Sequence, residues 1–337
     1  MNKEPILSIV IPTYGRVKFL ETTVTIFISQ IIQGGFENEV EIVIGDDASP
    51  DETATYLNTL EKKYPFIRPV INIKNLGVSG NVEKIITLAR GKFIWGFGED
   101  DLITKNALKK VLDSIKTDDP NIILLNTINI TSLDDKNLNY KLWGHNRLDM
   151  NKDIFITSFK DEKDKLAPVK KWFYLSNLIS AVVFRKELFL AGLPETKKYL
   201  RAENVYLFQG PIIIGIATRG RLKLMADRLV LHRKNENHWS GKTEGLFRIN
   251  LYDASEAIRL VKAYLPSEYK DYQKIFAVHT FTTIKRAKQQ GKSITNYILD
   301  SIKEYYSCFP YSLRFFIALL TPGVVFRIYQ RLRKTAP

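Results

Sequence analysis

The chain has 337 residues, of which 45% are apolar and 12% aromatic, so it can bury a sizeable core and does not have the composition of a disordered protein. A single cysteine, Cys308, excludes an internal disulfide and a cysteine-based metal site. The net charge of +14 points to anionic partners, but no recognised nucleic-acid motif is present, so we expect no nucleic acid among them.

Neither end of the chain predicts a membrane span. The start, from Met1 to Pro5, carries one Lys and one Glu and passes directly into a short strand-like run, unlike a signal peptide. The longest apolar stretch, from Phe315 to Phe326, contains Pro322 and Gly323 and falls short of the roughly 20 residues that cross a bilayer. We therefore expect a cytoplasmic protein.

Short β-branched runs alternate with segments of helical period from residue 5 to about residue 130. The runs that predict buried strands are ILSIVIP (6–12), VEIVIGD (40–46), RPVINI (68–73), KFIWGF (92–97) and NIILLNTINI (121–130). The segments with helical period cover 17–33, 51–63, 79–90 and 104–116, the last with Thr104 as its candidate N-cap. This alternation predicts an α/β protein with a mostly parallel sheet and helices on both faces.

The pattern changes in the second half of the chain. Residues 132–175 are polar and predict long loops with short strands. They are followed by a predicted strand, a helix and a further strand, over 178–184, about 203–218 and 221–233. Because the sequence is helical from residue 245 onward, we predict a first domain at 1–240 and a helical, basic domain at 241–337.

Acidic residues gather where two of the predicted strands end, in GDDAS (45–49) and GEDD (98–101). Ligands of parallel sheets bind outside the carboxyl ends of the strands. Adjacent carboxylates repel one another unless a cation or hydrogen-bond donors hold them ionised, and oxygen-rich clusters suit Mg²⁺ or Mn²⁺ bound together with a diphosphate. Each cluster alone is also explained as acids at a helix start. Their convergence on one sheet edge favours a metal and phosphate site.

Three stretches within residues 5–125 resemble the family 2 glycosyltransferases: LSIVIPTYGR, EIVIGDDASPDET and NLGVSGNVEKIITLARGKFIWGFGEDDLI. The family has the GT-A fold, and the layout is most similar to the abequosyltransferase-type enzymes of bacterial O-antigen assembly. The resemblance implies an inverting hexosyl- or deoxyhexosyltransferase that uses Mg²⁺ or Mn²⁺. Its donor would be a nucleoside-diphosphate sugar, and its acceptor a lipid-linked saccharide in the biosynthesis of a bacterial surface polysaccharide such as lipopolysaccharide or capsule.

The resemblance also implies roles for individual residues in binding the nucleotide. Pro12, Thr13 and Tyr14 match positions that line the base and the ribose. Asp47 matches the residue that hydrogen-bonds the base, and Asp46 stands beside it. The loop departs from the family in one position, because residue 15 is Gly where Asn is common.

Further matches concern the segment that closes over the nucleoside and the metal motif. Asn75 and Asn81 fall in the closing segment, which lacks the family's usual Arg before Asn81. Asp100 and Asp101 match the metal and ribose-diphosphate motif, in which Asp100 serves both the nucleotide and the ion. Gly98 and Glu99 stand where the family commonly has Asp-x, so the motif is a variant.

The family places its catalytic base in a Glu-Asp pair, and the best match here is RAENVYLF, with Glu203 followed by Asn204. Glu203 is therefore the candidate base; it could instead orient the acceptor, or be a solvated acid at a helix start. His232 and Arg233 are candidates for contacting the diphosphate, the Arg through its fork of donors, and a structural role for the His is the alternative. Trp239 either packs over a sugar or covers the core.

The C-terminal region carries much of the positive charge. Residues 281–337 contain ten Lys or Arg against two acids, a net charge of +8. The segment 309–334 mixes aromatic, aliphatic and Arg residues, which predicts peripheral association with the cytoplasmic face of the inner membrane. An ordinary basic helix pair packed on the first domain is the alternative.

Two other functions stay open from the sequence. One is a catalytically inactive, membrane-associated sugar-binding or scaffold protein, which the missing Asp at position 204 and the variant metal motif would suit. The other is a different nucleotide-sugar enzyme such as a nucleotidyltransferase. That enzyme would need a Gly-rich basic loop after the first strand, where PTYGR offers one Gly and one Arg.

Overall fold

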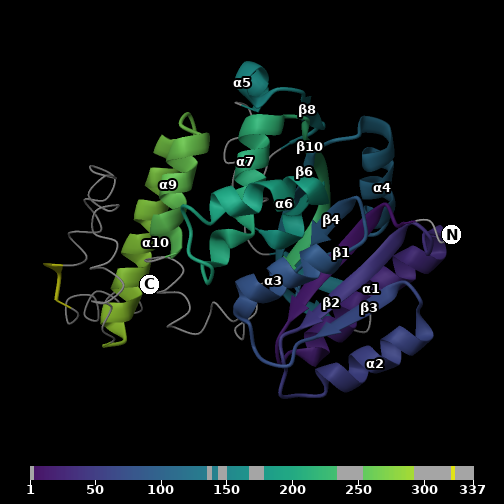
Figure 1. The fold of residues 1–337 in the computed structure, drawn as a ribbon. Helices are drawn as coiled ribbons and strands as arrows, with labels where there is room; N and C mark the ends of the chain where they lie inside the picture. The colour runs from purple at the N-terminus through teal and green to yellow at the C-terminus, as the bar shows by residue number, and fades with distance from the viewer. Residues whose placement is uncertain are drawn as a thin grey trace. The chain divides into compact units, whose positions relative to one another are not determined.

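The computed structural model describes residues 4–134, 139–142, 150–166, 178–233, 253–291 and 320–322. The chain divides into two compact units, the first comprising residues 1–196 and 207–235 and the second residues 197–206 and 236–337. The first unit contains the sheet, and the second contains helices α9 (Ala254–Tyr264) and α10 (Tyr269–Gln289) (Figure 1). The boundary predicted near residue 240 falls outside the described residues.

Ten strands of the described chain form one mixed sheet with the spatial order β3-β2-β1-β4-β9-β6-β10-β5, while β7 pairs with β6 and β8 with β10. Strands β1 to β4, β6 and β10 run in one direction, because β9 is antiparallel to both of its neighbours. The predicted mostly parallel α/β sheet is therefore confirmed. The strands are β1 (Leu7–Thr13), β2 (Val40–Asp46), β3 (Ile67–Ile71), β4 (Phe93–Gly96), β5 (Leu102–Ile103), β6 (Ile122–Asp134), β7 (Asn139–Leu142), β8 (Ile154–Ile156), β9 (Val182–Arg185) and β10 (Leu222–Arg233).

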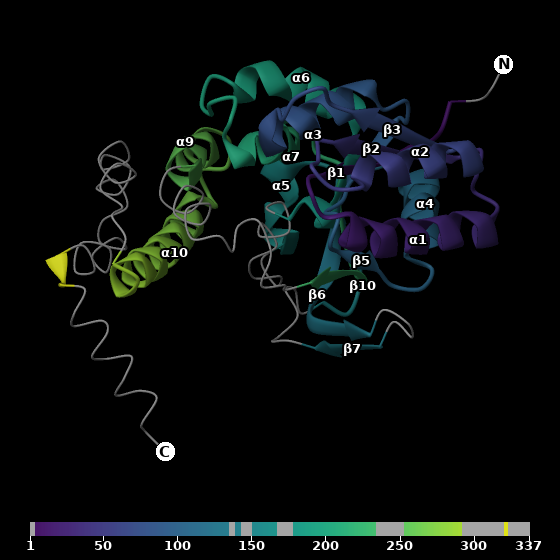
Figure 2. The ribbon, with the colours of Figure 1, turned by 90° about the horizontal axis from the view of Figure 1, so that it is seen from below.

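The helices of the first unit cover both faces of this sheet (Figures 1 and 2). The α-helices are α1 (Val17–Gly34), α2 (Thr53–Lys63), α3 (Gly77–Leu88), α4 (Ala107–Asp118), α5 (Phe159–Glu162), α6 (Lys186–Thr196) and α7 (Gln209–Arg219). Because β1 lies between β2 and β4, the loops that follow these three parallel strands leave the sheet at the same edge. The acidic segments predicted from the sequence are two of these loops.

The core on one face joins α1, α2 and α4 to alternate residues of the central strands. Phe27 of α1 packs edge-on against Trp95 and Phe97, with ring centroids 5.6 and 4.8 Å apart. All three rings are fully buried. Burial of large aromatic side chains is a main source of stability, so this contact fixes α1 beside β4 and the loop that follows it.

Helix α3 packs on the opposite face, over β1 and β2. The close approach needs Gly45 in β2, because a Cβ at this position would lie 2.5 Å from Ile85 and 2.6 Å from Asn81. The amide nitrogen of the Asn81 side chain donates to the Gly45 carbonyl over 2.8 Å. Asn81 thus joins α3 to the sheet.

Two predicted helix starts are wrong. The helix predicted from Thr104 begins at Ala107, and the Thr104 hydroxyl instead donates to the carbonyl of Arg228 in β10 over 3.1 Å. The helix predicted from about residue 203 begins at Gln209. Pro211 has no amide hydrogen and is tolerated in the first turn of a helix, so it marks this start better than the apolar pattern does.

Other elements differ from the predictions in detail. The strand predicted over 178–184 is a 3₁₀ turn, Ile179–Ala181, followed by β9. Helix α6 and the short strand β5 escape the prediction. Short 3₁₀ turns are also present at Lys163–Leu166 and Val205–Leu207. Within the described part of the chain, no helix is both long and apolar enough to span a bilayer.

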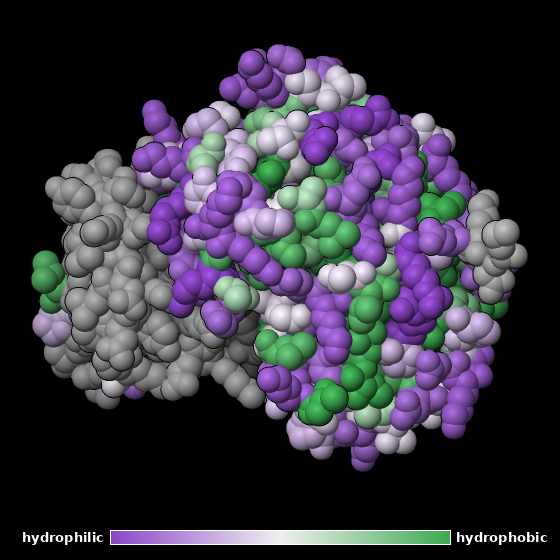
Figure 3. All heavy atoms as spheres, viewed as in Figure 1, coloured by the Kyte–Doolittle hydropathy of each residue, from purple (hydrophilic) through white to green (hydrophobic). Residues whose placement is uncertain are grey.

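Exposed apolar side chains gather around the loop between β3 and α3. The exposed apolar residues in and beside this loop are Ile71, Ile73, Leu76 and Val78. Figure 3 shows that hydrophobic atoms lie among hydrophilic ones on this face of the molecule. The C-terminal segment 309–334 lies outside the described residues except for 320–322, so its predicted membrane contact stays a prediction.

Candidate functional site

The loops that follow β1 and β2 are joined by hydrogen bonds. The Asp47 amide donates to the Thr13 carbonyl over 3.0 Å, and the Gly15 amide donates to the Ser49 hydroxyl over 2.8 Å. Gly15 has a φ of 63°, in the left-handed region that Gly and Asn adopt most easily. Glycine in place of the family's Asn therefore preserves the backbone conformation of this loop.

The residues predicted to line the nucleotide differ in exposure. Pro12 and Thr13 are the last residues of β1, and Tyr14 beyond them is half exposed. The Thr13 hydroxyl is buried, and its oxygen has no hydrogen-bond partner in the described part of the chain. This hydroxyl lies near the Glu99 carboxylate and lowers its pKa, so Thr13 belongs to the same buried polar cluster as the acidic loop that follows β4.

Asp47 is the centre of a buried polar network. Its Oδ1 accepts from the Leu76 amide over 2.8 Å and from Nδ2 of Asn72 over 2.9 Å. The same Asn72 nitrogen donates to Oδ1 of Asn81 over 3.1 Å, and Nζ of Lys84 donates to Oδ1 of Asn72 over 2.6 Å. The network ties the loop before α3 to the end of β2.

Asp46 and Asp51 shape the loop that leads into α2. Oδ1 of Asp46 accepts from the Ser49 amide over 3.0 Å. Asp51 accepts from the Thr53 amide over 3.2 Å and from the Val17 amide over 3.2 Å, so Asp51 satisfies helix-start amides of both α1 and α2. The first amides of a helix lack partners within it, and here Asp51 supplies one for α2, so Asp46 and Asp47 are not its caps.

Asn75 and Asn81 lie in different surroundings. Asn75 is exposed, and its Oδ1 accepts from the Gly77 amide over 2.9 Å in the turn before α3. Asn81 is 1% exposed, with its side-chain atoms bonded to Gly45 and Asn72. Asn75 is therefore at the surface of the segment, and Asn81 supports that segment from beneath.

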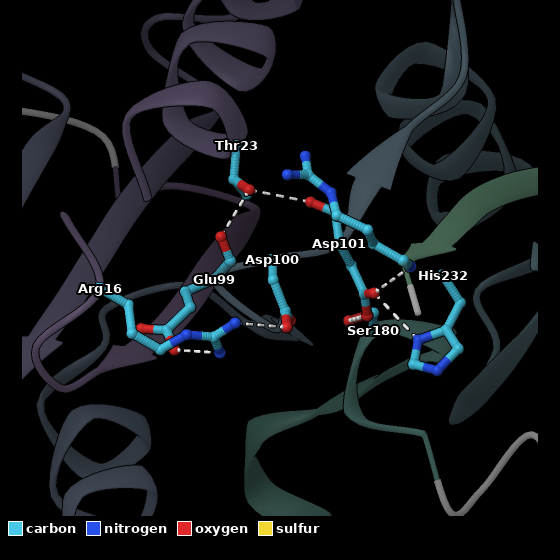
Figure 4. Close-up of polar contacts among 8 residues, drawn as sticks. Arg16, Thr23, Glu99, Asp100, Asp101, Ser180 and His232 are labelled. Carbon is cyan, nitrogen blue, oxygen red and sulfur yellow. Dashed lines mark hydrogen bonds and ion pairs between the residues drawn. The ribbon is translucent and has the colours of Figure 1, made fainter. Parts of the chain in front are cut away.

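The acidic loop, residues 98–101, places its first two acids against one arginine (Figure 4). Nη1 of Arg16 lies 2.8 Å from Oε1 of Glu99, and Nη2 lies 3.0 Å from Oδ2 of Asp100. None of the three side chains is more than 13% exposed. A single guanidinium therefore bridges two neighbouring carboxylates that would otherwise repel each other.

Asp101 points toward a different set of partners (Figure 4). Its Oδ2 accepts from the Ser180 hydroxyl over 2.5 Å, while Oδ1 lies 2.9 Å from Nδ1 of His232 and accepts from the Arg233 amide over 3.1 Å. Burial opposes ionisation of Asp101, but the charge and hydrogen bond of His232, with the donors of Ser180 and Arg233, hold its pKa below the usual range. Both oxygens of Asp101 thus serve the fold.

Glu99 is held less completely than Asp101. Burial raises the pKa of Glu99 to about 7, against the opposing effects of the nearby Thr13 hydroxyl and the Arg16 guanidinium. Its Oε2 is buried without a hydrogen-bond partner among the residues that the structure places. Glu99 therefore keeps one oxygen that the protein does not satisfy.

The backbone of the acidic loop is fixed from two sides. The Thr23 hydroxyl of α1 lies 2.7 Å from the Glu99 carbonyl oxygen and 2.9 Å from that of Asp101, and the Gly98 amide donates to the Ser180 hydroxyl over 2.8 Å. A Cβ at Gly98 would lie 3.3 Å from Oδ2 of Asp101 and 3.4 Å from Oδ1 of Asp100. The glycine in place of the family's Asp keeps another carboxylate out of this crowded turn.

The oxygen atoms of this site suit a divalent ion whose remaining coordination positions are filled by a bound ligand. No group of three or more His, Cys, Asp or Glu side chains forms a ready metal site within the described residues. Mg²⁺ and Mn²⁺ usually bind through one or two carboxylates together with substrate phosphates, so fewer protein ligands suffice. A carboxylate of Asp100 and the unpartnered oxygens of Glu99 and Thr13 match the preference of these ions for oxygen.

His232 and Arg233 end β10 beside the acidic loop. The Arg233 guanidinium lies 5.3 Å from the centroid of the Phe19 ring, and the Arg16 guanidinium lies 4.6 Å from the same centroid. Cations are attracted to aromatic rings at such distances. The guanidinium groups of Arg16 and Arg233 thus both contact Phe19 beside the acidic loop. Trp239, by contrast, falls outside the described residues.

The Glu203–Asn204 pair belongs to the second unit. Glu203 is exposed, whereas Asn204 is fully buried. Nδ2 of Asn204 donates to Oε2 of Glu256 over 2.7 Å and to the Asp253 carbonyl over 3.1 Å. Nε of Arg201 donates to the other oxygen of Glu256 over 2.7 Å. The amide that replaces the family's Asp is therefore a structural donor to α9.

Several residues of the site were not predicted from the sequence, among them Arg16, Asn72 and Ser180. Asn72 follows the end of β3, so the rule that singles out strand ends would find it once the strand is ended at Ile71 instead of Ile73. Arg16 follows PTYG directly, and the excess of acids at the neighbouring strand ends calls for a cation. Ser180 gives no signal, because it lies in an apolar run that reads as a strand.

Solved structures of similar fold place this architecture among the GT-A glycosyltransferases. S. aureus TarS 1-349 has a TM-score of 0.53 and 15% identity, covering 90% of this chain and 89% of that chain. The mannosyltransferase PcManGT from Pyrobaculum calidifontis, solved with GDP-Man and Mn²⁺, has a TM-score of 0.52 and 11% identity, covering 99% of this chain and 89% of that chain. At these identities the likeness concerns the fold alone, and it confirms the predicted GT-A fold.

The sequence comparisons give the family that this segment of the chain resembles. Residues 8–174, just under half of the chain, match the family model of Glycosyl transferase family 2. Abequosyltransferase RfbV from Salmonella typhimurium is 36% identical over 106 residues, which cover 31% of this chain and 30% of that protein. The GalNAc(5)-diNAcBac-PP-undecaprenol beta-1,3-glucosyltransferase of Campylobacter jejuni is 28% identical over 109 residues, which cover 32% of this chain and 34% of that enzyme. The matched segments thus span about a third of these relatives' length.

We expect Asp101→Asn to lower the free energy of unfolding by about 2 kcal/mol, because an amide cannot accept at both of its ends. Urea unfolding of the full chain followed by circular dichroism measures this change. Asp113→Asn is the matched control, since Asp113 makes an exposed ion pair with Lys109 and should change the stability by less than about 1 kcal/mol. Equal effects of the two variants would contradict a structural role for Asp101.

We expect Asn204→Asp to destabilise the protein by about 2 kcal/mol or more, because it places a new buried carboxylate against Glu256. The pKa of such an acid rises, so the loss of stability should be smaller at mildly acidic pH, where the new acid is protonated, than at mildly alkaline pH. Thermal unfolding of the full chain at both pH values tests this. Asn58→Asp, on the exposed face of α2, is the control and should show neither effect.

Proposed function

We propose that this protein is an inverting, metal-dependent glycosyltransferase that transfers a hexosyl or deoxyhexosyl group from a nucleoside-diphosphate sugar to a saccharide acceptor. The observation that carries the proposal is the buried acidic loop at the end of β4, at the same sheet edge as the loops after β1 and β2. In a family 2 domain, this edge binds the nucleoside of the donor on one side and its diphosphate on the other. Mg²⁺ or Mn²⁺ is the proposed cofactor.

In this proposal the nucleoside lies against the loops after β1 and β2. Tyr14 offers an exposed ring, Thr13 an unpartnered hydroxyl, and the network of Asp47 holds the loop before α3, with Asn75 at its surface. Pro12 and Asp46 set the path of the two loops. These groups bind and orient the donor, so that its diphosphate reaches the acidic loop.

Asp100 is the proposed carboxylate that holds the divalent ion, which when bound neutralises the charge of the departing diphosphate. Asp101 was predicted from the sequence as a second metal residue, but both of its oxygens are engaged by Ser180, His232 and the Arg233 amide. Its proposed role is therefore to position the loop that carries Asp100. Arg233 is the proposed diphosphate contact among the basic residues of β10. Its guanidinium suits phosphate because it presents a planar fork of donors.

Glu203 is the proposed general base, which takes the proton of the acceptor hydroxyl as that hydroxyl attacks the anomeric carbon. Its exposure leaves it accessible to an acceptor, whereas Asn204 is buried and has no proton-accepting carboxylate. Trp239 is the proposed contact of the acceptor sugar. A catalytically inactive sugar-binding or scaffold protein is the second candidate, because the pair that supplies the base has lost its Asp.

A lipid-linked saccharide of bacterial surface polysaccharide assembly is the proposed acceptor. The names of two relatives support it, one an abequosyltransferase and the other a glucosyltransferase whose substrate name contains undecaprenol. We place the protein in the cytoplasm, on the cytoplasmic face of the inner membrane. The composition of residues 309–334 supports contact with anionic lipid.

A donor screen tests the function. We expect one class among UDP-, GDP-, CDP- and dTDP-sugars to raise the melting temperature and to be slowly hydrolysed, in both cases only with Mn²⁺ or Mg²⁺ present. Asp100→Asn should remove both effects while the fold persists. If no nucleotide sugar stabilises the protein, the enzyme proposal fails; if one binds without hydrolysis or transfer, the inactive candidate is favoured.

Flotation of the full chain with vesicles tests the membrane contact. We expect binding to vesicles of anionic lipid, falling with salt, and lost in a variant in which four C-terminal basic residues are changed to Gln: Arg327, Arg331, Arg333 and Lys334. The control changes four exposed Lys of the first unit to Gln: Lys62, Lys63, Lys105 and Lys152. Equal loss in both variants would mean that net charge, and not the C-terminal segment, holds the protein to lipid.

A further inference from the structure

We propose that Arg16 is the internal counter-cation of the acidic loop, which occupies Asp100 while no divalent ion is bound and gives it up when the ion binds. This inference rests on the metal dependence proposed above. It makes Arg16 a positioning residue, because it acts on the ion through Asp100 and Glu99. The first step of metal binding is then an exchange of one cation for another.

The geometry places Arg16 in competition with the ion. The guanidinium contacts one oxygen of each carboxylate, at 2.8 and 3.0 Å, and not both oxygens of a single acid. An ion bound by Asp100 draws on the carboxylate charge that Arg16 now neutralises. Two cations cannot share a buried carboxylate without repelling each other, so tighter binding of one means weaker binding of the other.

The contact is also incomplete for a purely structural ion pair. Nε of Arg16 and Oε2 of Glu99 are both buried without a hydrogen-bond partner in the described part of the chain. A carboxylate needs donors at both oxygens to offset its burial fully. The pair therefore leaves one donor nitrogen and one acceptor oxygen without a hydrogen bond at the position where a divalent ion would bind.

Glu41, on β2, shows what a completed pair looks like in the same sheet. Its Oε1 accepts from the Ser8 hydroxyl over 2.6 Å and from the Arg90 amide over 2.5 Å. Its Oε2 accepts from Nη1 of Arg68 over 3.0 Å. Both oxygens are satisfied, so Arg68 and Glu41 are a matched structural pair, distinct from Arg16 and its acids.

The Phe19 ring offers the guanidinium of Arg16 a cation–π contact once it has left Asp100. The Arg16 guanidinium already lies 4.6 Å from the centroid of this ring, one helical turn further along α1. Stacking on an aromatic ring keeps an arginine charged and partly desolvated without an acid partner. Arg16 can thus leave Asp100 by a change in its own side-chain torsions, without movement of the backbone.

Titration of the full chain with Mn²⁺ in the absence of nucleotide, with free ion followed by electron paramagnetic resonance, tests the inference. We expect Arg16→Gln to bind Mn²⁺ about tenfold more tightly than the unmodified protein, because a charged hydrogen-bonded competitor has been removed. Arg16→Lys keeps the charge but loses the fork, and should tighten binding less. Arg68→Gln, which removes an arginine of the matched structural pair, should leave Mn²⁺ affinity unchanged.

Adding Asp100→Asn to Arg16→Gln should abolish the gain, which would place the tightened ion on Asp100. Damage to the fold cannot imitate the expected result, since it would weaken the binding of the ion. Unchanged or weaker Mn²⁺ binding in Arg16→Gln overturns the inference; if that variant does not fold, the same outcome in Arg16→Lys does so. The readout needs no donor, so tightened Mn²⁺ binding without any nucleotide-sugar binding would sink the proposed function and leave this inference standing.

Discussion

Three neighbouring carboxylates can be buried at the end of one strand only if donors and cations face them, and this constraint organises the first unit. Asp101 is met by Ser180 from the turn before β9 and by His232 and Arg233 from β10. Segments that are far apart in the sequence thus meet at one carboxyl group. The electrostatic cost of burying the acids is therefore offset by tertiary contacts and not by groups within the loop alone.

The three acids of the acidic loop differ in how fully the protein satisfies their oxygens. Asp101 is saturated by donors, whereas Glu99 keeps an oxygen without a partner and shares a single arginine with Asp100. A similar division holds at the start of α3, where the side chain of Asn81 is bonded to Gly45 of β2 and Asn75 lies at the surface. Residues adjacent in sequence therefore carry different duties, and only their partners tell them apart.

Much of the fold could be predicted from the sequence, because buried parallel strands are continuous apolar runs and the helices between them are periodic. The acids at two strand ends were equally visible, since the topology of a parallel sheet brings those ends together. The partners of the acids could not be predicted in the same way. Ser180 lies in an apolar run, and the burial of Asn204 depends on Glu256, more than 50 residues away, which no local pattern reveals.

The failures at helix starts have a common physical origin. The Thr104 hydroxyl donates to β10, and Nδ2 of Asn204 donates to α9 while its Oδ1 accepts from the Tyr206 amide of a short 3₁₀ turn, so neither side chain starts the α-helix predicted there. Local propensity is a weak preference that tertiary contacts override. Pro211 and Asp51 lie close to the observed starts of α7 and α2, because a missing amide hydrogen and a carboxylate that accepts from the first helical amide act over short range.

Helix α1 lies along β4 and the acidic loop and holds both in place. Phe19, Thr23 and Phe27 are four residues apart and line one side of α1, and Arg16 is the residue directly before the helix. From the core outward, that side holds the aromatic rings of β4, then the carbonyls of the acidic loop, and then the acids themselves. The contacts that stabilise the core and the arginine that pairs with the acids therefore lie at one side of a single helix. A rotation of α1 would move Phe27, Thr23 and Arg16 together, so a change in the core would reach the acidic loop through this helix.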